Sequence, residues 1–465
     1  MKAKRPSIDD VTTINEDGSR YFVHPADVSG FWTRWRRVAA VFLIGVYIAL
    51  PLIRINGEPA VFLDVLHRKF HLFGLTLMFQ DLWLLFFLIT GTGFTLFLMT
   101  AIIGRVWCGW ACPQTVFLDH VFRRVERWID GDAMARRKLE SSPWTGGKAF
   151  RRVLKHGVFV LLAALIAHIF LSYFISVPVL YGMVLRSPAE NWGLFLFVLA
   201  VTGLLYFDFA WFREQFCIVL CPYGRLQSAL IDDNSIVVGY DEKRGEPRGK
   251  VGTTAGDCID CRRCLQVCPT GIDIHQGLQL ECIACEACID ACDEMMVKVE
   301  RKKGLIRHDS LNNLSGKPSR FLRPRLYLYL FFALVGASVF FFATRQVEPV
   351  IVSVLRLPGA PYIHDGSTVR NNFLLRLANK RPASHTYQIV IDSPQPQLRA
   401  DGATSHALVL GPGEEIQEPL ILSVPDADFR KNFDVTVKVV GEKGEVESRR
   451  RAPFLGPYRE GGPTP

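Results

Sequence analysis

Long runs of apolar residues, separated by charged segments, dominate the first three quarters of the chain. Five runs approach or reach the length of about 20 residues that a bilayer crossing needs; they cover residues 38–53, 82–103, 153–177, 192–212 and 326–343. The first is the shortest and contains Pro51 near its end. A buried helix of a soluble protein is the alternative for any single run, but the glycines and aromatic-rich ends are typical of membrane helices. The pattern predicts an α-helical transmembrane bundle of about five spans.

Short segments of alternating apolar and polar residues replace these runs from about residue 346 onward. Predicted strands cover 373–377, 387–391, 407–410, 419–424 and 433–439, and the glycine-containing segments 411–413 and 441–444 are turn sequences. Regularly spaced strands over about 100 residues indicate an all-β immunoglobulin-like sandwich. Residues 346–465 hold no cysteine and no clustered metal ligands, which favours a partner-docking or spacer role over catalysis.

Basic residues concentrate in some connecting segments and avoid others. Residues 1–37 and 104–152 are rich in lysine and arginine, whereas 53–81 and 177–191 hold few. By the positive-inside rule, residues 1–37, 104–152 and 213–325 are expected in the cytoplasm of a bacterium, and 346–465 in the periplasm beyond its inner membrane. The net charge of +9 thus follows from topology, and no nucleic-acid partner is expected. No signal peptide is expected either, because the first 37 residues are polar and charged.

Eight of the twelve cysteines form two copies of the run C-x2-C-x2-C-x3-C. In bacterial-type ferredoxins, each copy gives three thiolates to one [4Fe–4S] cluster and its fourth to the other. One cluster is therefore expected on Cys258, Cys261, Cys264 and Cys292, and the second on Cys282, Cys285, Cys288 and Cys268. A zinc ribbon is the alternative, but zinc sites use pairs of cysteines rather than interleaved quartets. Asp293 stands where a second proline would follow, which leaves the ligand set unchanged.

The remaining four cysteines form two C-x3-C-P motifs, each just after an apolar run. They are Cys108 and Cys112, followed by Pro113, and Cys217 and Cys221, followed by Pro222. On a helix this spacing places two thiols one turn apart, and soft thiolates select Cu(I), zinc or iron–sulfur iron. A copper site, a third cluster and a redox-active dithiol all remain open. Ordinary buried cysteines are the alternative, since cysteine is often interior, but two copies of one motif favour a metal or redox role.

These elements predict five parts in sequence. They are a cytoplasmic tail (1–37), a membrane domain with four spans (38–230), a 2[4Fe–4S] ferredoxin domain of α+β type (231–320), a fifth transmembrane helix (326–343) and the sandwich (346–465). All twelve cysteines then lie at or inside the cytoplasmic face, where thiols stay reduced. His168, Asp208, His120 and the pair His67 and His71 are weaker candidates for metal or proton chemistry, because ionisable groups in or near membrane spans are often functional.

Taken together, the order of the motifs resembles the cytochrome oxidase accessory proteins of the CcoG/FixG/RdxA family. The similarity rests on Cys108-Gly-Trp-Ala-Cys112-Pro-Gln, Trp211-Phe-Arg-Glu-Gln-Phe-Cys217 with Cys221-Pro-Tyr-Gly, both ferredoxin runs and the β tail. The resemblance implies maturation of cbb3-type cytochrome c oxidase by reduction of Cu(II) to Cu(I). In that role the eight ferredoxin cysteines would relay electrons, and Cys108, Cys112, Cys217 and Cys221 would bind or reduce copper.

Three functions compete. The first is this cupric reductase activity. The second is an electron-transfer subunit that takes electrons from quinol or a cytoplasmic donor and passes them to a partner complex. The third is a non-catalytic scaffold that docks onto oxidase subunits or assembly factors. The chain shows no G-x-G-x-x-G fingerprint in a strand–helix context, so NAD(P)H oxidation by this chain alone is not expected.

Overall fold

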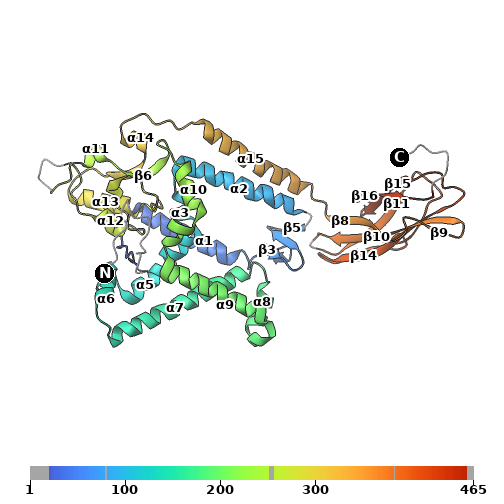
Figure 1. Cartoon of the computed structure of the whole chain (residues 1–465), viewed down its shortest axis with the longest axis horizontal. Coiled ribbons are helices and arrows are strands. Elements are labelled where there is room, and N and C mark those ends of the chain that lie inside the picture. The colour runs from blue at the N-terminus through green and yellow to red at the C-terminus, as the bar shows by residue number, and fades with distance from the viewer. Residues whose placement is uncertain (1–19, 79–80, 251–255, 382, 458–465) are drawn as a thin grey trace. The chain divides into compact units, whose positions relative to one another are not determined.

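The computed structural model describes residues 20–78, 81–250, 256–381 and 383–457, and the chain forms two compact units (Figure 1). The first unit comprises residues 1–53, 59–63 and 83–340, and the second comprises residues 54–58, 64–82 and 341–465. Helices and the ferredoxin fold make up most of the first unit, and the second is built mainly of strands.

Four helical segments within the described residues are long and apolar enough to cross a membrane. They are α2 (Leu82–Ile103), α7 (Gly146–Leu171), the continuous segment Pro188–Phe212 and α15 (Pro324–Arg345). The third contains η3 (Pro188–Asn191), α9 (Trp192–Phe207) and the π-helix η4 (Asp208–Phe212). Large apolar side chains on these helices are exposed, Ile89 and Leu161 among them, as a helix in lipid requires. Four of the five predicted spans are therefore present as apolar helices.

Helix α2 packs against α15 through glycine. A side chain at Gly336 would lie 2.7 Å from the Cα of Gly91, so only glycine permits this approach of the two helices. Phe94 and Phe332 stack nearby, with ring centroids 4.8 Å apart. Small residues at close helix crossings are typical of membrane bundles, where packing rather than water drives association.

The first predicted span corresponds to α1 (Phe31–Ala49), which begins seven residues earlier than predicted and ends before Pro51. Three arginines, at positions 34, 36 and 37, fall inside it, so its composition alone does not qualify it as a span. Its length is sufficient for a crossing. Near its start, Thr33 bonds to Asp290 of the ferredoxin fold, and near its end Tyr47 donates to the carbonyl of Ile166 in α7. Nineteen residues rise about 28 Å, close to the thickness of a bilayer core.

Shorter elements connect the long helices. Between α2 and α7 lie α3 (Val106–Trp110), α4 (Pro113–Phe117), the π-helix η2 (Leu118–Phe122), α5 (Arg123–Asp130) and α6 (Ala133–Ser141). Helix α8 (Val177–Val184) precedes the third long helical segment, and the π-helix η5 (Phe216–Leu220) and α10 (Pro222–Leu230) follow it. Both C-x3-C-P motifs lie in these connections.

The ferredoxin fold is framed by β6 (Ile236–Tyr240) and β7 (Ile306–Ser310), which pair antiparallel. Its helices are α11 (Glu242–Gly245), α12 (Arg263–Val267), η6 (Ile274–Gln276), α13 (Ala287–Lys298) and α14 (Leu311–Leu314). The core beneath the strands combines apolar side chains such as Val238 and Leu305 with cysteines, including Cys258 and Cys264. The α+β ferredoxin is thus one body with the membrane helices of the first unit.

The second unit is a two-sheet sandwich. One sheet has the order β12-β14-β10-β8 with β9 beside β10, and the other has the order β13-β11-β15-β16. The strands are β8 (Val350–Arg356), β9 (Ile363–Asp365), β10 (Thr368–Asn379), β11 (His385–Asp392), β12 (Arg399–Gly402), β13 (Leu408–Leu410), β14 (Glu415–Pro425), β15 (Phe433–Val440) and β16 (Val446–Phe454). Alternate residues of β10, β14 and β15 are buried and form one core around Phe373 and Tyr387. All five predicted strands are present.

Residues 54–78, for which no structure was predicted, form five short strands. They are β1 (Arg54–Ile55), β2 (Glu58–Pro59), β3 (Val61–Asp64), β4 (Lys69–Leu72) and β5 (Leu75–Met78). The turn between β4 and β5 uses positive φ angles at Phe73 (50°) and Gly74 (85°). Alternation over four residues is too short to distinguish such strands from loops in a sequence.

Candidate functional site

The two C-x3-C-P motifs adopt one local geometry. In each, the second cysteine is the N-cap of the next helix with extended backbone, at ψ 126° for Cys112 and 108° for Cys221, and proline occupies the first helical turn. In each, that cysteine's N–H donates to the residue five positions earlier, Trp107 at 2.9 Å and Phe216 at 2.8 Å. Proline fits there because the first turn of a helix needs no N–H donor. The motifs are therefore structural repeats.

The repeat extends to the residue four positions before the first cysteine of each motif. Gly104 has a φ of 62° and Arg213 has a φ of 51°. Glycine adopts this conformation freely, whereas arginine does so at a cost. The side chain of Arg213 is held by a buried ion pair with Glu126, which supports the conformation.

The four thiols of the two motifs converge. Cys217 interacts electrostatically with Cys112, Cys108 and Cys221, and Cys108 interacts with Cys112 and Cys221. Burial, reinforced by the neighbouring thiols, raises the pKa of Cys108 to about 12, so a metal would bind with release of protons. The Cys108 sulfur lies 3.1 Å from Oε1 of the fully buried Gln227 in α10, which links the first motif to the helix that follows the second.

The sulfur spacing bears on what this site can hold. A single tetrahedral ion with metal–sulfur bonds of 2.3 Å keeps its sulfurs about 3.8 Å apart. Among the described residues, His385, Glu445 and Glu447 of the sandwich place three donor atoms within 4.8 Å of one another. No three of the cysteine sulfurs lie as close together. Glu447 is already paired with Arg381 at 2.8 Å. A four-iron cubane holds its sulfur ligands further apart than a single ion does, because four irons separate them.

Each predicted ferredoxin ligand set lines its own cavity. The first cavity is lined by Cys258, Cys261, Cys264 and Cys292, and the second by Cys268, Cys282, Cys285 and Cys288; Cys264 lies between them and lines both. The electrostatic neighbours agree with this division: Cys292 interacts with the cysteines of the first run, and Cys268 interacts with those of the second. The fourth cysteine of each run thus lies with the other run.

The thiol site adjoins the second of these cavities. A side chain at Gly109 would lie 2.5 Å from the carbonyl oxygen of Ile283 and 2.7 Å from that of Ala284, both in the loop between Cys282 and Cys285. Trp110 donates from its indole nitrogen to Glu286 at 2.7 Å. Cys108 itself packs into the apolar cluster that contains Cys285.

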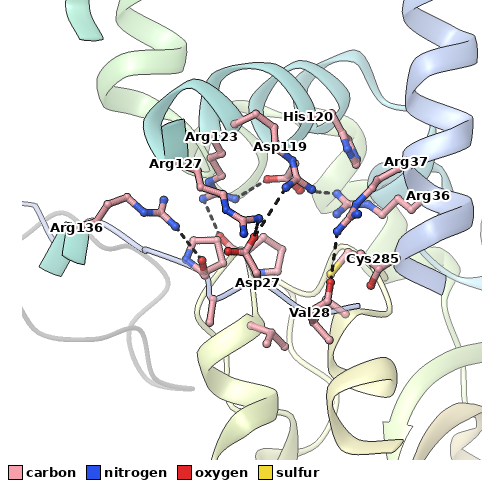
Figure 2. A pocket seen from close by; sticks show the side chains of 17 residues that line it. Asp27, Val28, Arg36, Arg37, Asp119, His120, Arg123, Arg127, Arg136 and Cys285 are labelled. Atoms are coloured by element: carbon pink, nitrogen blue, oxygen red, sulfur yellow. Dashed lines mark hydrogen bonds and ion pairs between the residues drawn. The ribbon is translucent and has the colours of Figure 1, made fainter. Parts of the chain in front are cut away.

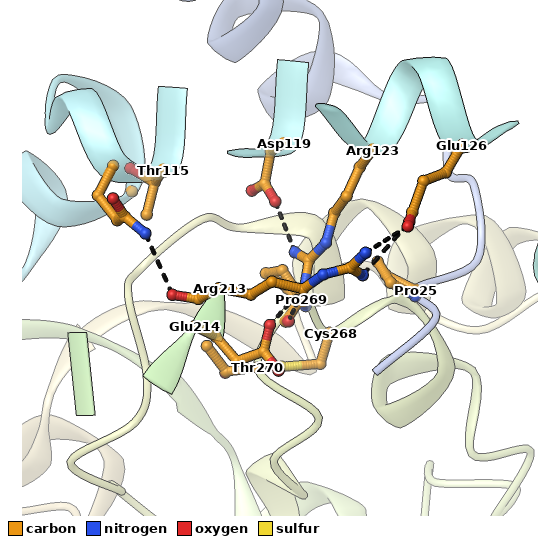
Figure 3. Close-up of polar contacts among 12 residues, drawn as sticks. Pro25, Thr115, Asp119, Arg123, Glu126, Arg213, Glu214, Cys268, Pro269 and Thr270 are labelled. Carbon is orange, nitrogen blue, oxygen red and sulfur yellow. Dashed lines mark hydrogen bonds and ion pairs between the residues drawn. The ribbon is translucent and has the colours of Figure 1, made fainter. Parts of the chain in front are cut away.

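A buried ion-pair network holds these parts together (Figure 3). Arg123 donates to Asp119 at 2.6 Å, to Glu214 at 3.0 Å and to the carbonyl of Pro269, the residue after Cys268, at 2.9 Å. One guanidinium therefore touches the first motif's helix, the segment before Cys217 and the loop of the second cavity. Buried charges of this kind must be paired, because removing one partner costs about 3–5 kcal/mol.

The pKa values in the network follow from its pairing. Burial alone would raise the pKa of Asp119, but Arg36 and Arg123 outweigh it and hold that pKa well below its usual range. Burial is likewise outweighed at Glu126, whose pKa falls to about 2 beside Arg213 and Lys155. Both carboxylates are therefore charged at neutral pH.

This network was missed in the sequence, although a signal was present. Asp119, Arg123 and Glu126 follow the first motif at spacings of four and three residues, which places them on one face of a helix. Arg213 and Glu214 stand four and three residues before Cys217, the first cysteine of the second motif. Paired charges beside both cysteine motifs could have indicated a shared ionic contact.

The weaker candidates have separate surroundings. His168 bonds to the carbonyl of Ala164 in its own helix, at 2.7 Å. Asp208 accepts from Gln114, the residue after the first C-x3-C-P motif, at 3.0 Å, and so joins the thiol site. His67 bonds to Asp64 at 2.6 Å, and His71 bonds to Thr76 at 3.0 Å. His120 lines an arginine-rich cavity described below.

Together, the apolar helices and the cysteine cavities define a membrane-bound iron–sulfur protein. Comparison with known families agrees. A family described as "4Fe-4S binding domain" matches residues 82–132, and a "4Fe-4S dicluster domain" matches residues 212–254 and 248–311. Residues 339–457 match a family described as an "IG-like fold at C-terminal of FixG".

Relatives along most of the chain place it more narrowly. Protein RdxA of Cereibacter sphaeroides is 36% identical over 389 residues, with 80% of this chain and 82% of RdxA covered. Nitrogen fixation protein FixG of Rhizobium meliloti is 34% identical over 430 residues, with 82% and 81% covered. Ferredoxin-type protein NapH of Haemophilus influenzae is 26% identical over 299 residues, with 58% and 88% covered. The chain belongs to the FixG/RdxA family of iron–sulfur electron-transfer proteins.

Proposed function

We propose that this protein reduces Cu(II) to Cu(I) at the thiols of Cys108, Cys112, Cys217 and Cys221, to supply the copper centre of cbb3-type cytochrome c oxidase. Copper is the substrate, and each ion takes up one electron. The resemblance to oxidase accessory proteins supports the oxidase as the destination. The soft donor set supports copper, because thiolates stabilise Cu(I) over Cu(II).

The residues of the ferredoxin fold fit two [4Fe–4S] clusters. Each predicted set of four cysteines lines one of two cavities, with Cys264 lining both, and each set draws on both runs as the interleaved assignment requires. Cys258, Cys261, Cys264 and Cys292 would hold the first cluster, and Cys282, Cys285, Cys288 and Cys268 the second. Bound there, such clusters supply single electrons. Buried apolar side chains, such as Ile274 and Met296, line the two cavities beside these cysteines.

One observation carries the proposal: Gly109 and Trp110 of the first motif lie directly on the loop Cys282–Glu286. The site at which a metal would be reduced is thereby held against the cysteines that would deliver the electron. An electron-transfer subunit would also use this contact but would deliver its electrons to a partner complex. A scaffold would need neither the contact nor the thiols.

A second possibility for the same four cysteines is a third [4Fe–4S] cluster, because no three of their sulfurs lie within 4.8 Å of one another, as a single tetrahedral ion would require. Iron content of anaerobically purified protein separates the two. About eight irons per chain correspond to two clusters, and about twelve to three. In the second case the protein would be an electron-transfer chain whose acceptor is a partner complex or copper bound elsewhere.

The test is a quadruple Cys→Ser variant at positions 108, 112, 217 and 221. It should keep the two ferredoxin clusters, because their ligand set is complete without these thiols, and lose Cu(I) binding and most Cu(II) reduction, because hydroxyls are poor Cu(I) ligands. Reduction is measured with a chemical reductant and a chromogenic Cu(I) chelator. Wild-type reduction with both clusters intact would contradict the role of these thiols. In cells, reduced oxidase activity that added copper partly restores is expected.

For topology, we infer five crossings of the bacterial inner membrane, with the ferredoxin in the cytoplasm and the sandwich in the periplasm. The distribution of basic residues supports this sidedness. So do the contacts of α1, whose two ends bond to the ferredoxin fold and to the far part of α7.

A further inference from the structure

An arginine-rich cavity lies between the start of α1, the helices after the first motif and the ferredoxin loops (Figure 2). Two aspartates, Asp27 and Asp119, line it, together with six arginines: Arg36, Arg37, Arg123, Arg124, Arg127 and Arg136. Cys285 of the second ferredoxin run also lines the cavity. The lining thus has four more positive than negative groups, at the edge of a predicted iron–sulfur site.

The arginines divide into an inner and an outer group. Arg36 and Arg123 share Asp119, at 2.5 and 2.6 Å, and both are buried. At the mouth, Arg124 and Arg127 share Asp27, at 3.8 and 2.5 Å. Arg37 donates weakly to the carbonyl of Val28 at 3.4 Å, and no described carboxylate lies within ion-pair distance of it. The outer group, Arg37, Arg124 and Arg127, therefore has only one negative partner among the described residues.

Arg136 adds buried donor capacity to the same cavity. Its side chain is 5% exposed and donates to the carbonyl of Pro25 at 3.0 Å. Its Nε and Nη1 atoms have no hydrogen-bond partner among the described residues, and Nη1 lies 3.6 Å from Glu126. Buried donors without a bond are costly, so a ligand that accepts from them would be favoured.

Titration behaviour agrees with an excess of positive charge. Burial first, and then Arg36, lower the pKa of His120 to about 4, against the opposing effect of Asp119. Burial and the neighbouring Arg37 lower the pKa of Arg124. The outer arginines are not explained by the negative charge of a nearby iron–sulfur cluster. The arginine whose charge acts on Cys285 is Arg36, which belongs to the inner group.

We propose that this cavity binds an anionic ligand through a phosphate group, with the outer arginines and Arg136 as donors. Guanidinium groups bind phosphate oxygens in pairs, and several arginines converging on one hollow are typical of phosphate recognition. The phosphate has two sources at this face: a soluble phosphate-bearing molecule, or the headgroup of an anionic phospholipid. The proposal is independent of whether copper is the substrate.

The binding test uses full-length protein with its clusters, in uncharged detergent and in vesicles. Pyrophosphate is titrated by calorimetry in detergent, and vesicles of phosphatidylcholine with or without phosphatidylglycerol are compared for their effect on the thermal midpoint. The double variant Arg124→Gln with Arg127→Gln removes two outer donors, and Arg151→Gln is the matched control, an exposed arginine of α7 outside the cavity. Cluster absorbance reports the integrity of each variant.

Loss of one charged donor weakens binding by about tenfold or more, so the double variant should bind about 100-fold more weakly, with the control within about twofold of wild type. Pyrophosphate binding that the double variant loses identifies a soluble ligand. If phosphatidylglycerol vesicles raise the thermal midpoint of the wild type but not of the double variant, and pyrophosphate does not bind, the ligand is a lipid headgroup. If the double variant loses its clusters, Arg37→Gln replaces it. Equal behaviour of the outer-arginine variant and the control, or no response to either probe, would overturn the proposal.

Discussion

Gly109→Ala tests the contact between the thiol site and the ferredoxin loop with a single methyl group. The added Cβ would lie 2.5, 2.7 and 2.9 Å from three backbone atoms of Ile283 and Ala284. Real Cβ contacts are essentially never shorter than 3.0 Å, so the nearest oxygen must retreat by about 0.5 Å. Because every atom it meets is backbone, no side-chain rotation relieves the clash, and the loop Cys282–Cys285 has to move.

The cost of such overpacking is about 1–3 kcal/mol. If the substitution destabilises the docked conformation of the loop by this amount, the ratio of docked to displaced loop falls about 5- to 150-fold. Electron delivery to the thiols should fall by a factor in this range, whereas each ferredoxin ligand set remains complete. The lower end of the range applies if the loop relaxes easily.

The assay is Cu(II) reduction by protein whose clusters have first been reduced chemically, with cluster content measured by EPR on the same sample. Gly203→Ala is the control, because a Cβ at this position of α9 meets no atom within 4 Å. It should behave as wild type or be slightly more stable, since alanine is preferred to glycine within a helix. Equal reduction rates in the two variants, with clusters intact, would refute a functional contact at Gly109.

Three further predictions concern ligands, topology and pH. Cys292→Ser should remove the EPR signal of the cluster held mainly by the run that begins at Cys258, and Cys268→Ser that of the cluster held mainly by the run that begins at Cys282. If each variant instead loses the cluster of the run to which its cysteine belongs, the interleaved assignment is wrong. Reporter fusions after Lys302 and after Gly456 should show opposite sidedness, and equal sidedness would mean a wrong count of crossings. The pKa of His120 is about 4 in the fold against an ordinary 6.5, so the unfolded chain binds this proton first as pH falls. The midpoint temperature of thermal unfolding should therefore decrease as the pH is lowered from about 6.5 to 4. His120→Gln should make this dependence on pH weaker.

Most of the architecture could be predicted from the sequence because its signals are local. Runs of apolar residues such as 82–103 identify helices by length alone, and α2 has those bounds. Alternation in the tail locates β10, β11, β13, β14 and β15, because a half-buried strand buries alternate residues. The start of α1 was misplaced because Arg34, Arg36 and Arg37 obscure its apolar character, although Arg36 is buried through its bonds to Gly109 and Asp119.

The spacing of the cysteines predicts which thiols share a ligand set, and each predicted set lines one cavity. What the sequence could not supply was the position of the thiol site against the ferredoxin. That position depends on contacts between residues far apart in the sequence, and local patterns do not reveal them. Trp110 and Glu286 are 176 positions apart, and Gln114 and Asp208 are 94 positions apart. The arginine cavity has the same origin, because it assembles donors from α1, η2, α5 and α6.

The two C-x3-C-P repeats differ in one respect that bears on mechanism. The first contributes Gly109 and Trp110 to the ferredoxin loop, whereas the second reaches the ferredoxin through Glu214, Arg123 and the carbonyl of Pro269. The first contact is close packing of backbone on backbone, and the second is an ionic link through a single guanidinium. Both contacts end on the second ferredoxin cavity, one on the loop after Cys282 and the other on the peptide after Cys268. Both repeats therefore lie beside the second cavity. For the proposed reduction we infer that electrons enter at the first cavity, on the Cys258 side, and leave from the second.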